Sequence, residues 1–308
     1  MDRVITSIKP VHSLVSAVMA GVGEPYLMVQ GTTSPHTFSL RPSDAVRLEN
    51  AQIIFLVDRS IETSLVKPAH TLGGNAPVFM LSETKGLVLR KFREDRAFET
   101  HSHETNHAHE HHEDAGHHAG HGIAHEKDPH PAEGPYDMHV WLDPENAGVM
   151  ARKIAEVLSE ADPDNAAVYA ANARTLQHRL DELTAKITTD LIPVRDKSFI
   201  LLHDAYQYFE ARFGLRASGS VMVDPVHAPS AQRIQKLRNK VQELGAVCVF
   251  SEPQFSSRLI EVITENTQAR VGVLDPLGAT IEAGPEAYFT LLHDLATSFR
   301  ECLAPADH

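Results

Sequence analysis

The sequence lacks any apolar run long enough to cross a membrane, and it has few basic residues. No stretch of the 308 residues approaches the roughly 20 apolar residues that span a bilayer as a helix. Lys and Arg number 28 against 41 Asp and Glu, which gives a net charge of −13. Nucleic-acid binding depends on clustered Lys and Arg. This balance therefore argues against nucleic acid as the main partner.

Cysteine is also scarce. The chain has only Cys248 and Cys302, and no CxxC spacing, so cysteine is a poor candidate for a zinc ligand here. In a cytosolic protein two such cysteines are usually free thiols, whereas in an exported protein they usually form a disulfide. No secretory signal is visible, because Met1 leads almost directly into the first expected strand.

Histidine, by contrast, is abundant. Of the 20 histidines, eleven lie in one segment: His101, His103, His107, His109, His111, His112, His117, His118, His121, His125 and His130. Residues 93–135 contain almost no large apolar side chains, so they are predicted to be a disordered His-rich insertion that cannot pack a core. We expect these histidines to form weak accessory zinc sites, because each bound ion must order flexible chain. The alternative is a merely solvated polar loop.

The rest of the chain alternates between strands and helices. The expected strands are 3–8, 26–30, 52–57, 77–81, 198–202, 246–250 and 270–274. Most of these strands are continuous apolar runs, which is typical of parallel strands buried on both faces. Alternating strands and helices indicate βα units. The sequence therefore predicts an α/β protein with two Rossmann-like βα lobes and mostly parallel sheets.

One long helix is predicted between the two halves. From Asp164 to about Leu191, the large apolar residues recur mostly at spacings of three, four or seven. Such a helix reaches roughly 40 Å, about the diameter of a domain. We therefore expect an N-terminal lobe over 1–163, a connecting helix over 164–192 and a C-terminal lobe over 193–308.

Four polar residues are candidates for one site, and two of them directly follow expected strands. His36 lies in the loop after strand 26–30, His139 lies where the ordered chain resumes, and His203 and Asp275 directly follow strands. In open parallel sheets, ligands bind at the carboxyl ends of the strands. Three imidazoles and one carboxylate suit tetrahedral Zn²⁺. If these residues converge they form a metal site in the cleft between the lobes; taken singly, each is a structural residue.

Five segments carry a resemblance to a known family. In order they are GTTSPHTFSLRPSD, DMHVWLDP, LLHDAYQYF, FSEPQFSS and VGVLDPLG. They resemble successive motifs of the zinc-specific solute-binding proteins of bacterial ABC transporters. That metal-binding family also includes manganese-binding members and streptococcal adhesins. The resemblance covers nearly the whole chain, including an acidic His-rich insertion before the second motif and a long helix between the lobes.

The resemblance implies a ligand set. It implies that His36, His139 and His203 bind the metal, with Asp275 or a water molecule in the fourth position. Manganese members typically have Glu where this chain has His203, and a nitrogen donor moves the site towards Zn²⁺. Some zinc members offer a Glu just before the first histidine, but this chain has Pro35 there.

Two further expectations concern Glu252 and the cysteines. Glu252 follows strand 246–250, so we expect it to face the same cleft and to orient an imidazole. The resemblance to zinc members that have a bridge at this place favours a disulfide between Cys248 and Cys302.

The leading functional hypothesis is high-affinity capture of Zn²⁺ in the periplasm and its delivery to the membrane permease of an ABC transporter. Zn²⁺ is then a transported ligand, and the protein is a monomer, is not an enzyme and has no signal peptide in this chain. The alternatives are a zinc-dependent hydrolase, a histidine-rich metal store or chaperone, and a Mn²⁺-binding relative. The hydrolase reading lacks an HExxH motif, and a fourth protein ligand would close the open position that catalysis needs.

Overall fold

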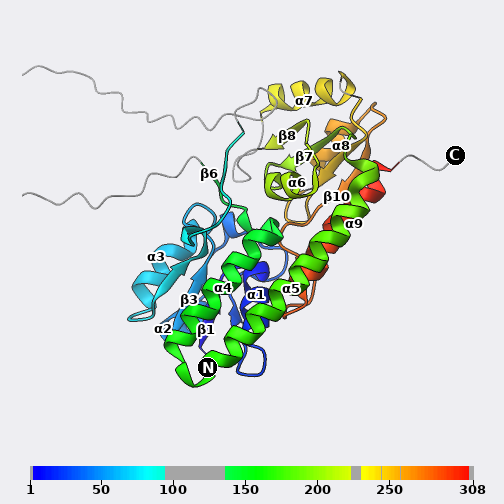
Figure 1. Cartoon of the computed structure of the whole chain (residues 1–308). Coiled ribbons are helices and arrows are strands. Elements are labelled where there is room, and N and C mark those ends of the chain that lie inside the picture. The colour runs from blue at the N-terminus through cyan, green and yellow to red at the C-terminus, as the bar shows by residue number, and fades with distance from the viewer. Residues whose placement is uncertain (1–2, 94–135, 223–229, 244, 257, 305–308) are drawn as a thin grey trace, which may run out of the picture.

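The computed structural model describes residues 3–93, 136–222, 230–243, 245–256 and 258–304. These residues form two βα lobes, one at each end of an elongated molecule (Figure 1). All eleven histidines between His101 and His130, and with them the expected accessory sites, lie outside the described residues.

The N-terminal lobe is built on a parallel four-stranded sheet with the order β2-β1-β3-β4. Its strands are β1 (Val4–Thr6), β2 (Tyr26–Leu27), β3 (Ile53–Leu56) and β4 (Val78–Met80), and its helices include α1 (Lys9–Val18), α2 (Pro42–Glu49) and α3 (Thr63–Leu72). β1 and β3 are buried along their whole length, as the continuous apolar runs predict for strands covered on both faces.

The C-terminal lobe repeats this construction with the order β10-β9-β7-β8, again with all strands parallel. Its strands are β7 (Phe199–His203), β8 (Gly219–Met222), β9 (Cys248–Ser251) and β10 (Arg270–Val273), and its helices are α6 (Gln207–Phe213), α7 (Ala231–Glu243), α8 (Arg258–Thr264) and α9 (Ala287–Leu303). A disulfide joins Cys248 in β9 to Cys302 in α9, which confirms the expected bridge.

One long helix, α5 (Ala166–Leu191), joins the lobes and follows α4 (Pro144–Ala161) of the N-terminal lobe. α4 begins at Asp143, whose side chain caps it by accepting a hydrogen bond from the backbone N–H of Glu145 at 3.0 Å. α5 runs beside α9 towards the C-terminal lobe (Figure 1). The large apolar side chains of α5 that the helical spacing selects, such as Leu176, Leu180 and Ile187, are buried. The predicted long joining helix is confirmed.

The chain also crosses between the lobes outside these helices. After β10, the segment 276–286 returns to the N-terminal lobe before α9 begins. There the indole N–H of Trp141 donates to the carbonyl of Pro276 at 2.9 Å, and Ser13 donates to that of Pro285 at 3.1 Å. Lys9, at the start of α1, donates to the carbonyls of Gly278, Ala279 and Ile281.

The sequence did not predict the short strands β5 (Arg90–Lys91) and β6 (Tyr136–Asp137) on either side of the insertion. Within the lobes, it also did not predict α3 and β8. α3 carries Pro68 in its interior, and proline is a helix-breaking signal. β8 starts at Gly219, and glycine is a poor strand former on intrinsic preference. These two elements are held by their neighbours: β8 pairs with β7, and α3 packs against α2.

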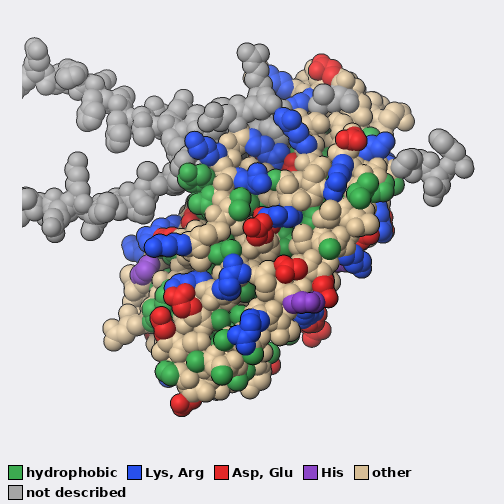
Figure 2. Space-filling model, viewed as in Figure 1, with side chains coloured by type: hydrophobic (Ala, Val, Ile, Leu, Met, Phe, Trp, Pro, Cys, Tyr) green, Lys and Arg blue, Asp and Glu red, His purple; other side chains and the backbone are tan. Residues whose placement is uncertain are grey.

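The described surface mixes residue types. On the face drawn in Figure 2, acidic and basic side chains are interspersed, and the hydrophobic side chains form small separate groups. Within the described part of the chain, no helix combines the length and the apolar character that a membrane span requires.

Candidate metal centre

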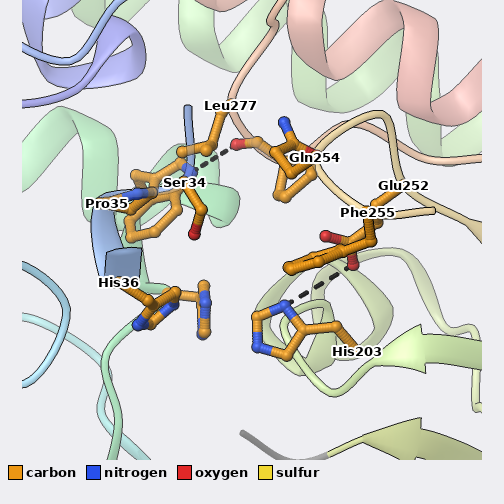
Figure 3. Close-up of a pocket in the computed structure, with 11 residues that line it drawn as sticks. Ser34, Pro35, His36, His203, Glu252, Gln254, Phe255 and Leu277 are labelled. Carbon is orange, nitrogen blue, oxygen red and sulfur yellow. Dashed lines mark hydrogen bonds and ion pairs between the residues drawn. The ribbon is translucent and has the colours of Figure 1, made fainter. Parts of the chain in front are cut away.

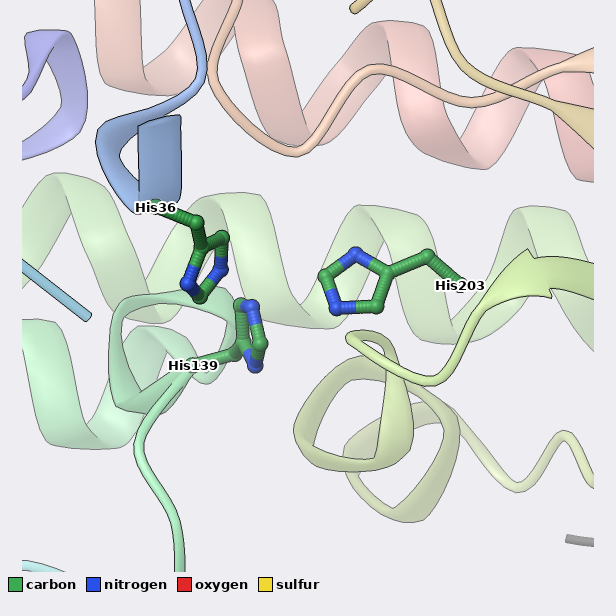
Figure 4. A group of neighbouring side chains, drawn as sticks. All are labelled: His36, His139 and His203. Carbon is green, nitrogen blue, oxygen red and sulfur yellow. The ribbon is translucent and has the colours of Figure 1, made fainter. Parts of the chain in front are cut away.

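Three histidines from different parts of the chain meet between the lobes (Figure 4). His36 sits in a short 3-10 turn, Pro35–Thr37, in which Pro35 occupies the first turn position. His139 immediately precedes another such turn, Val140–Leu142, and His203 is the last residue of β7. Two imidazoles therefore come from the N-terminal lobe and one from the carboxyl edge of the C-terminal sheet, where ligands of parallel sheets are expected.

The spacing of the three rings suits a metal ion. One ring nitrogen from each histidine lies within 4.8 Å of the corresponding nitrogens of the other two. The ring centroids are 5.8 Å apart for His36 and His139, 5.7 Å for His36 and His203, and 5.0 Å for His139 and His203. Tetrahedral Zn²⁺ with bonds of about 2.05 Å needs nitrogens about 3.3 Å apart. A small inward movement of the rings is therefore enough for coordination.

A carboxylate fixes the orientation of the His139 ring. Nδ1 of His139 donates to Oδ1 of Asp137 at 2.6 Å, and the backbone N–H of His139 donates to the same oxygen at 3.0 Å. Asp137 is completely buried. Because Nδ1 carries the proton, Nε2 keeps its lone pair for a metal ion.

The same arrangement recurs in the other lobe at a longer distance. Nδ1 of His203 lies 3.6 Å from Oε1 of Glu252, and both side chains are almost fully buried. Within the described part of the chain, this oxygen has no hydrogen-bond partner. Glu252 thus faces the ring that it was expected to orient, and the dashed line in Figure 3 marks the contact.

The pKa values of His36 and His203 are shifted in opposite directions. Burial, together with the neighbouring rings of His203 and His139, lowers the pKa of His36 to about 2. Burial by itself also lowers the pKa of His203, but the carboxylates, Glu252 foremost, outweigh it and hold that pKa above its usual value. His36 is therefore neutral and ready to bind a metal over the whole physiological range, whereas His203 binds protons more strongly.

Asp275 is not part of the histidine cluster. Its Oδ1 accepts from Nε2 of Gln254 at 2.8 Å and from the backbone N–H groups of Leu277 and Gly278, both at 3.0 Å. Its Oδ2 accepts from the N–H of Ala279 at 2.5 Å. Both oxygens therefore stabilise the turn that follows β10, and the only group of metal-binding side chains found among the described residues is the three histidines.

The pocket around the imidazoles is largely apolar. Its walls include Trp141. Phe255, Leu277 and Pro35, which also line it, are labelled in Figure 3. The Trp141 ring centroid lies 5.2 Å from that of His139, and the Phe255 ring centroid lies 6.3 Å from that of His203. An apolar lining limits access of water and strengthens charge interactions at a bound ion.

Sequence reasoning identified the three histidines but missed Asp137. The available signal was a carboxylate two residues before His139, at the edge of an expected ordered segment. His12 and His178 lie outside the cluster: His12 bonds to the carbonyl of Pro25, and His178 is exposed on α5.

Comparison with known proteins points to one family. Residues 4–302 match the ZnuA family model, described as zinc-uptake complex component A, periplasmic. The chain is 49% identical over 319 residues to the high-affinity zinc uptake system protein ZnuA of Brucella suis, covering 98% of the chain and 92% of that protein. It is 34% identical over 302 residues to the protein of the same name from Yersinia pestis, covering 97% and 91%.

Solved structures share the fold. A crystal structure of ZnuA superposes with a TM-score of 0.78 at 23% identity, covering 99% of each chain. The laminin-binding protein of Streptococcus agalactiae, described as an adhesin with metal-transporting activity, gives 0.71 at 23% identity, covering 97% and 99%. FpvC of Pseudomonas aeruginosa in complex with Mn²⁺ gives 0.76 at 19% identity, covering 98% of each chain. At these identities the likeness concerns the fold.

Proposed function

The chain belongs to the ZnuA family of periplasmic zinc-uptake components, and from that premise we propose that its three clustered histidines are the ligands of the captured ion. Members of this family are transport components and not enzymes, so the zinc hydrolase reading falls. The function is high-affinity zinc uptake. The ion is cargo, and the protein needs no open catalytic position.

The observation that supports the ligand assignment is the convergence of His36, His139 and His203 from both lobes within 4.8 Å. Neutral imidazoles are borderline-soft donors that suit Zn²⁺ better than Mn²⁺. Two of the three rings have a carboxylate beside Nδ1, which is the arrangement that orients metal-binding histidines in many proteins. We propose that Asp137 and Glu252 play this orienting role.

The fourth position is proposed for water or Asp275. Four N–H donors already engage the Asp275 carboxylate. To reach the ion, Asp275 must give up part of the turn that follows β10. Water fills the position with no such loss, so Asp275 contributes less to affinity than any of the histidines.

The wider assignment follows from the family. We propose that the protein is a periplasmic monomer that delivers Zn²⁺ to the permease of an ABC transporter. It acts as two lobes, 1–163 and 193–308, joined by the helix 164–192. The histidines between His101 and His130 are proposed to hold further zinc weakly.

Titration of the metal-free protein tests the proposal. We expect one tight Zn²⁺ site, a much weaker response to Mn²⁺, and a rise in the free energy of unfolding of about 4 kcal/mol when free zinc is a thousand times Kd. Calorimetry gives the stoichiometry, and thermal unfolding at pH 7.5 gives the stabilisation. A melting temperature that is indifferent to zinc would refute zinc capture by this chain.

A further inference from the structure

A two-stranded ribbon, which ends two residues before His139, contacts the C-terminal lobe. β5 (Arg90–Lys91) pairs antiparallel with β6 (Tyr136–Asp137), and the His-rich insertion lies between them in the sequence. The ribbon contacts α6 of the C-terminal lobe: the backbone N–H of Arg90 donates to the Tyr208 hydroxyl at 2.9 Å, and that hydroxyl donates to the carbonyl of Asp137 at 2.6 Å. Gln207 also donates to Oδ2 of Asp137 at 2.9 Å. The carboxylate that orients His139 is thus held from the other lobe.

Arg93, just beyond β5, makes an ion-pair contact with the C-terminal lobe. Its two terminal nitrogens donate to the two oxygens of Glu210 at 3.0 and 2.5 Å, and one of them lies 2.9 Å from Oδ1 of Asp204. Asp204 directly follows His203 in the sequence, and Glu210 lies on α6. One guanidinium therefore ties the end of the ribbon to the residue beside the third imidazole.

The three side chains Arg93, Asp204 and Glu210 are largely buried, so they do not form an ordinary surface ion pair. The exposed side-chain fractions are 17% for Arg93, 6% for Asp204 and 4% for Glu210. Glu210 is further fixed because Oε2 also accepts from the backbone N–H of Ala217 at 2.7 Å. Taking such charges out of water costs about as much as their attraction returns, so a buried pair adds little net stability, while removing one partner is strongly unfavourable. The bidentate contact between Arg93 and Glu210 instead fixes the relative position of the two side chains.

We propose that Arg93 is a positioning residue for zinc binding. By pairing with Asp204 and Glu210 across the lobes, it holds the segments that carry His139 and His203 at the separation that a single ion requires. The inference rests on the proposed zinc site and goes beyond it, because the contacts described for Arg93 are with Glu210 and Asp204, so it acts through the ribbon and the residue next to His203.

A purely electrostatic role predicts the opposite sign. Arg93 is a cation close to a site for a dication, so if its charge alone mattered, its removal would tighten zinc binding. If Arg93 positions the ligands, its removal weakens zinc binding. Arg93→Lys separates the two effects further, because lysine keeps the charge but cannot make the bidentate contact.

The experiment compares the zinc Kd of wild type, Arg93→Gln, Arg93→Lys and Arg238→Gln by competition with a chelator, together with thermal unfolding without metal. Arg238 pairs with Glu265 at 3.0 Å on the surface of the C-terminal lobe and is the matched control. We expect at least a tenfold weaker Kd in Arg93→Gln, an intermediate loss in Arg93→Lys and no change in Arg238→Gln. Should Arg93→Gln fail to fold, Arg93→Lys decides alone.

The outcomes separate the two proposals. If wild type and Arg238→Gln bind zinc tightly and the Arg93 variants match them or bind more tightly, the positioning role is overturned and the zinc site stands. If wild type itself binds no zinc, the proposed function fails, and this inference fails with it.

Discussion

The two lobes have the same sheet topology but use it differently. Numbered within each lobe, both sheets have the strand order 2-1-3-4 with every strand parallel. In the C-terminal lobe, the first strand ends in the ligand His203. In the N-terminal lobe, the first strand is followed instead by Ser7 and the start of α1, and His36 lies beyond the second strand. The same topology therefore gives both sheets a carboxyl edge, but the proposed zinc ligands follow different strands in the two lobes.

The carboxylates after the third strands show the same contrast. In the N-terminal lobe, Glu62 is completely buried and accepts from the backbone N–H groups of Val57 and Asp58 at 2.8 and 3.0 Å. In the C-terminal lobe, Glu252 leaves Oε1 facing the His203 ring. One acid is used to hold its own loop, and the other is available to a ligand. The difference shows that the function of a shared edge depends on which polar groups the backbone leaves unsatisfied.

The first prediction, and the largest effect, concerns the division of ligands between the lobes. His36→Ala, His139→Ala and His203→Ala should each weaken zinc binding by about a thousandfold, or about 4 kcal/mol, because each removes a nitrogen donor that is already in place. Competition with a chelator measures the loss. His178→Ala, at a side chain that is 75% exposed on α5, is the control and should bind like wild type.

His203→Ala is the most informative of the three variants. It removes the only imidazole that the C-terminal lobe contributes to the cluster within the described residues. If zinc binding survives this change at wild-type strength, the ion is held by the N-terminal lobe alone, and the comparison of the lobes as joint contributors is wrong.

Much of this division could be predicted from the sequence. The apolar runs and their limits place His36 in the loop after one strand and His203 at the end of another, and they place His139 where the ordered chain resumes. The resemblance to a known family joins the three into one ligand set, and the structure brings their side chains together. The proximity of Asp137 to His139 is visible in the sequence, but its contact with the C-terminal lobe could not be predicted, because that contact joins residues about 70 positions apart. Periodicity specifies which face of an element is buried, but not which distant polar group it meets.

The second prediction concerns the disulfide, which lies in the C-terminal lobe. The chain has two cysteines, and both lie in the C-terminal lobe, where they close a loop of 54 residues. Cys248→Ser with Cys302→Ser should lower the free energy of unfolding by about 4 kcal/mol in the chain-entropy account. Denaturant unfolding measures this loss. The zinc Kd should stay close to wild type because the bridge joins the start of β9 to α9, whereas His203 lies at the carboxyl end of β7.

A reduced wild-type sample is the matched control for the double variant and should unfold at a similar denaturant concentration. If the double variant keeps wild-type stability but loses zinc affinity, the bridge maintains the ligand geometry instead of the lobe. The disulfide would then act on the positions of the zinc ligands, as the contacts between the lobes are proposed to do.

The third prediction uses the opposite pKa shifts of His36 in the N-terminal lobe and His203 in the C-terminal lobe. His36, with a pKa of about 2, gives up no proton on binding zinc near neutral pH. His203 has a raised pKa, so protons compete with zinc there, and affinity should fall as pH drops through that pKa, by up to tenfold per unit for one competing proton. Titrations between pH 8 and pH 5 measure the profile.

Glu252→Gln should shift this profile. Without the carboxylate, burial lowers the pKa of His203, so the loss of affinity should move to lower pH. Glu182→Gln, beside the exposed His178, is the control and should leave the profile unchanged. A Glu252→Gln profile that coincides with wild type would show that His203 does not set the pH dependence.

The last prediction concerns the insertion, which lies between two strands of the ribbon and has no comparable His-rich counterpart in the C-terminal half of the sequence. Deleting residues 101–130 should remove several weak zinc sites and leave the tight site with an unchanged Kd. The clustered imidazoles are already placed on folded elements, so binding an ion there requires little further ordering of the backbone. Calorimetric stoichiometry before and after the deletion separates the tight site from the weak sites.

The insertion then contributes capacity and, through its local density of imidazoles and carboxylates, rate of capture, so uptake should suffer mainly when zinc is scarce. If the deletion removed the tightest site instead, the histidine-rich store would be the better description of this protein, and the cluster between the lobes would be structural.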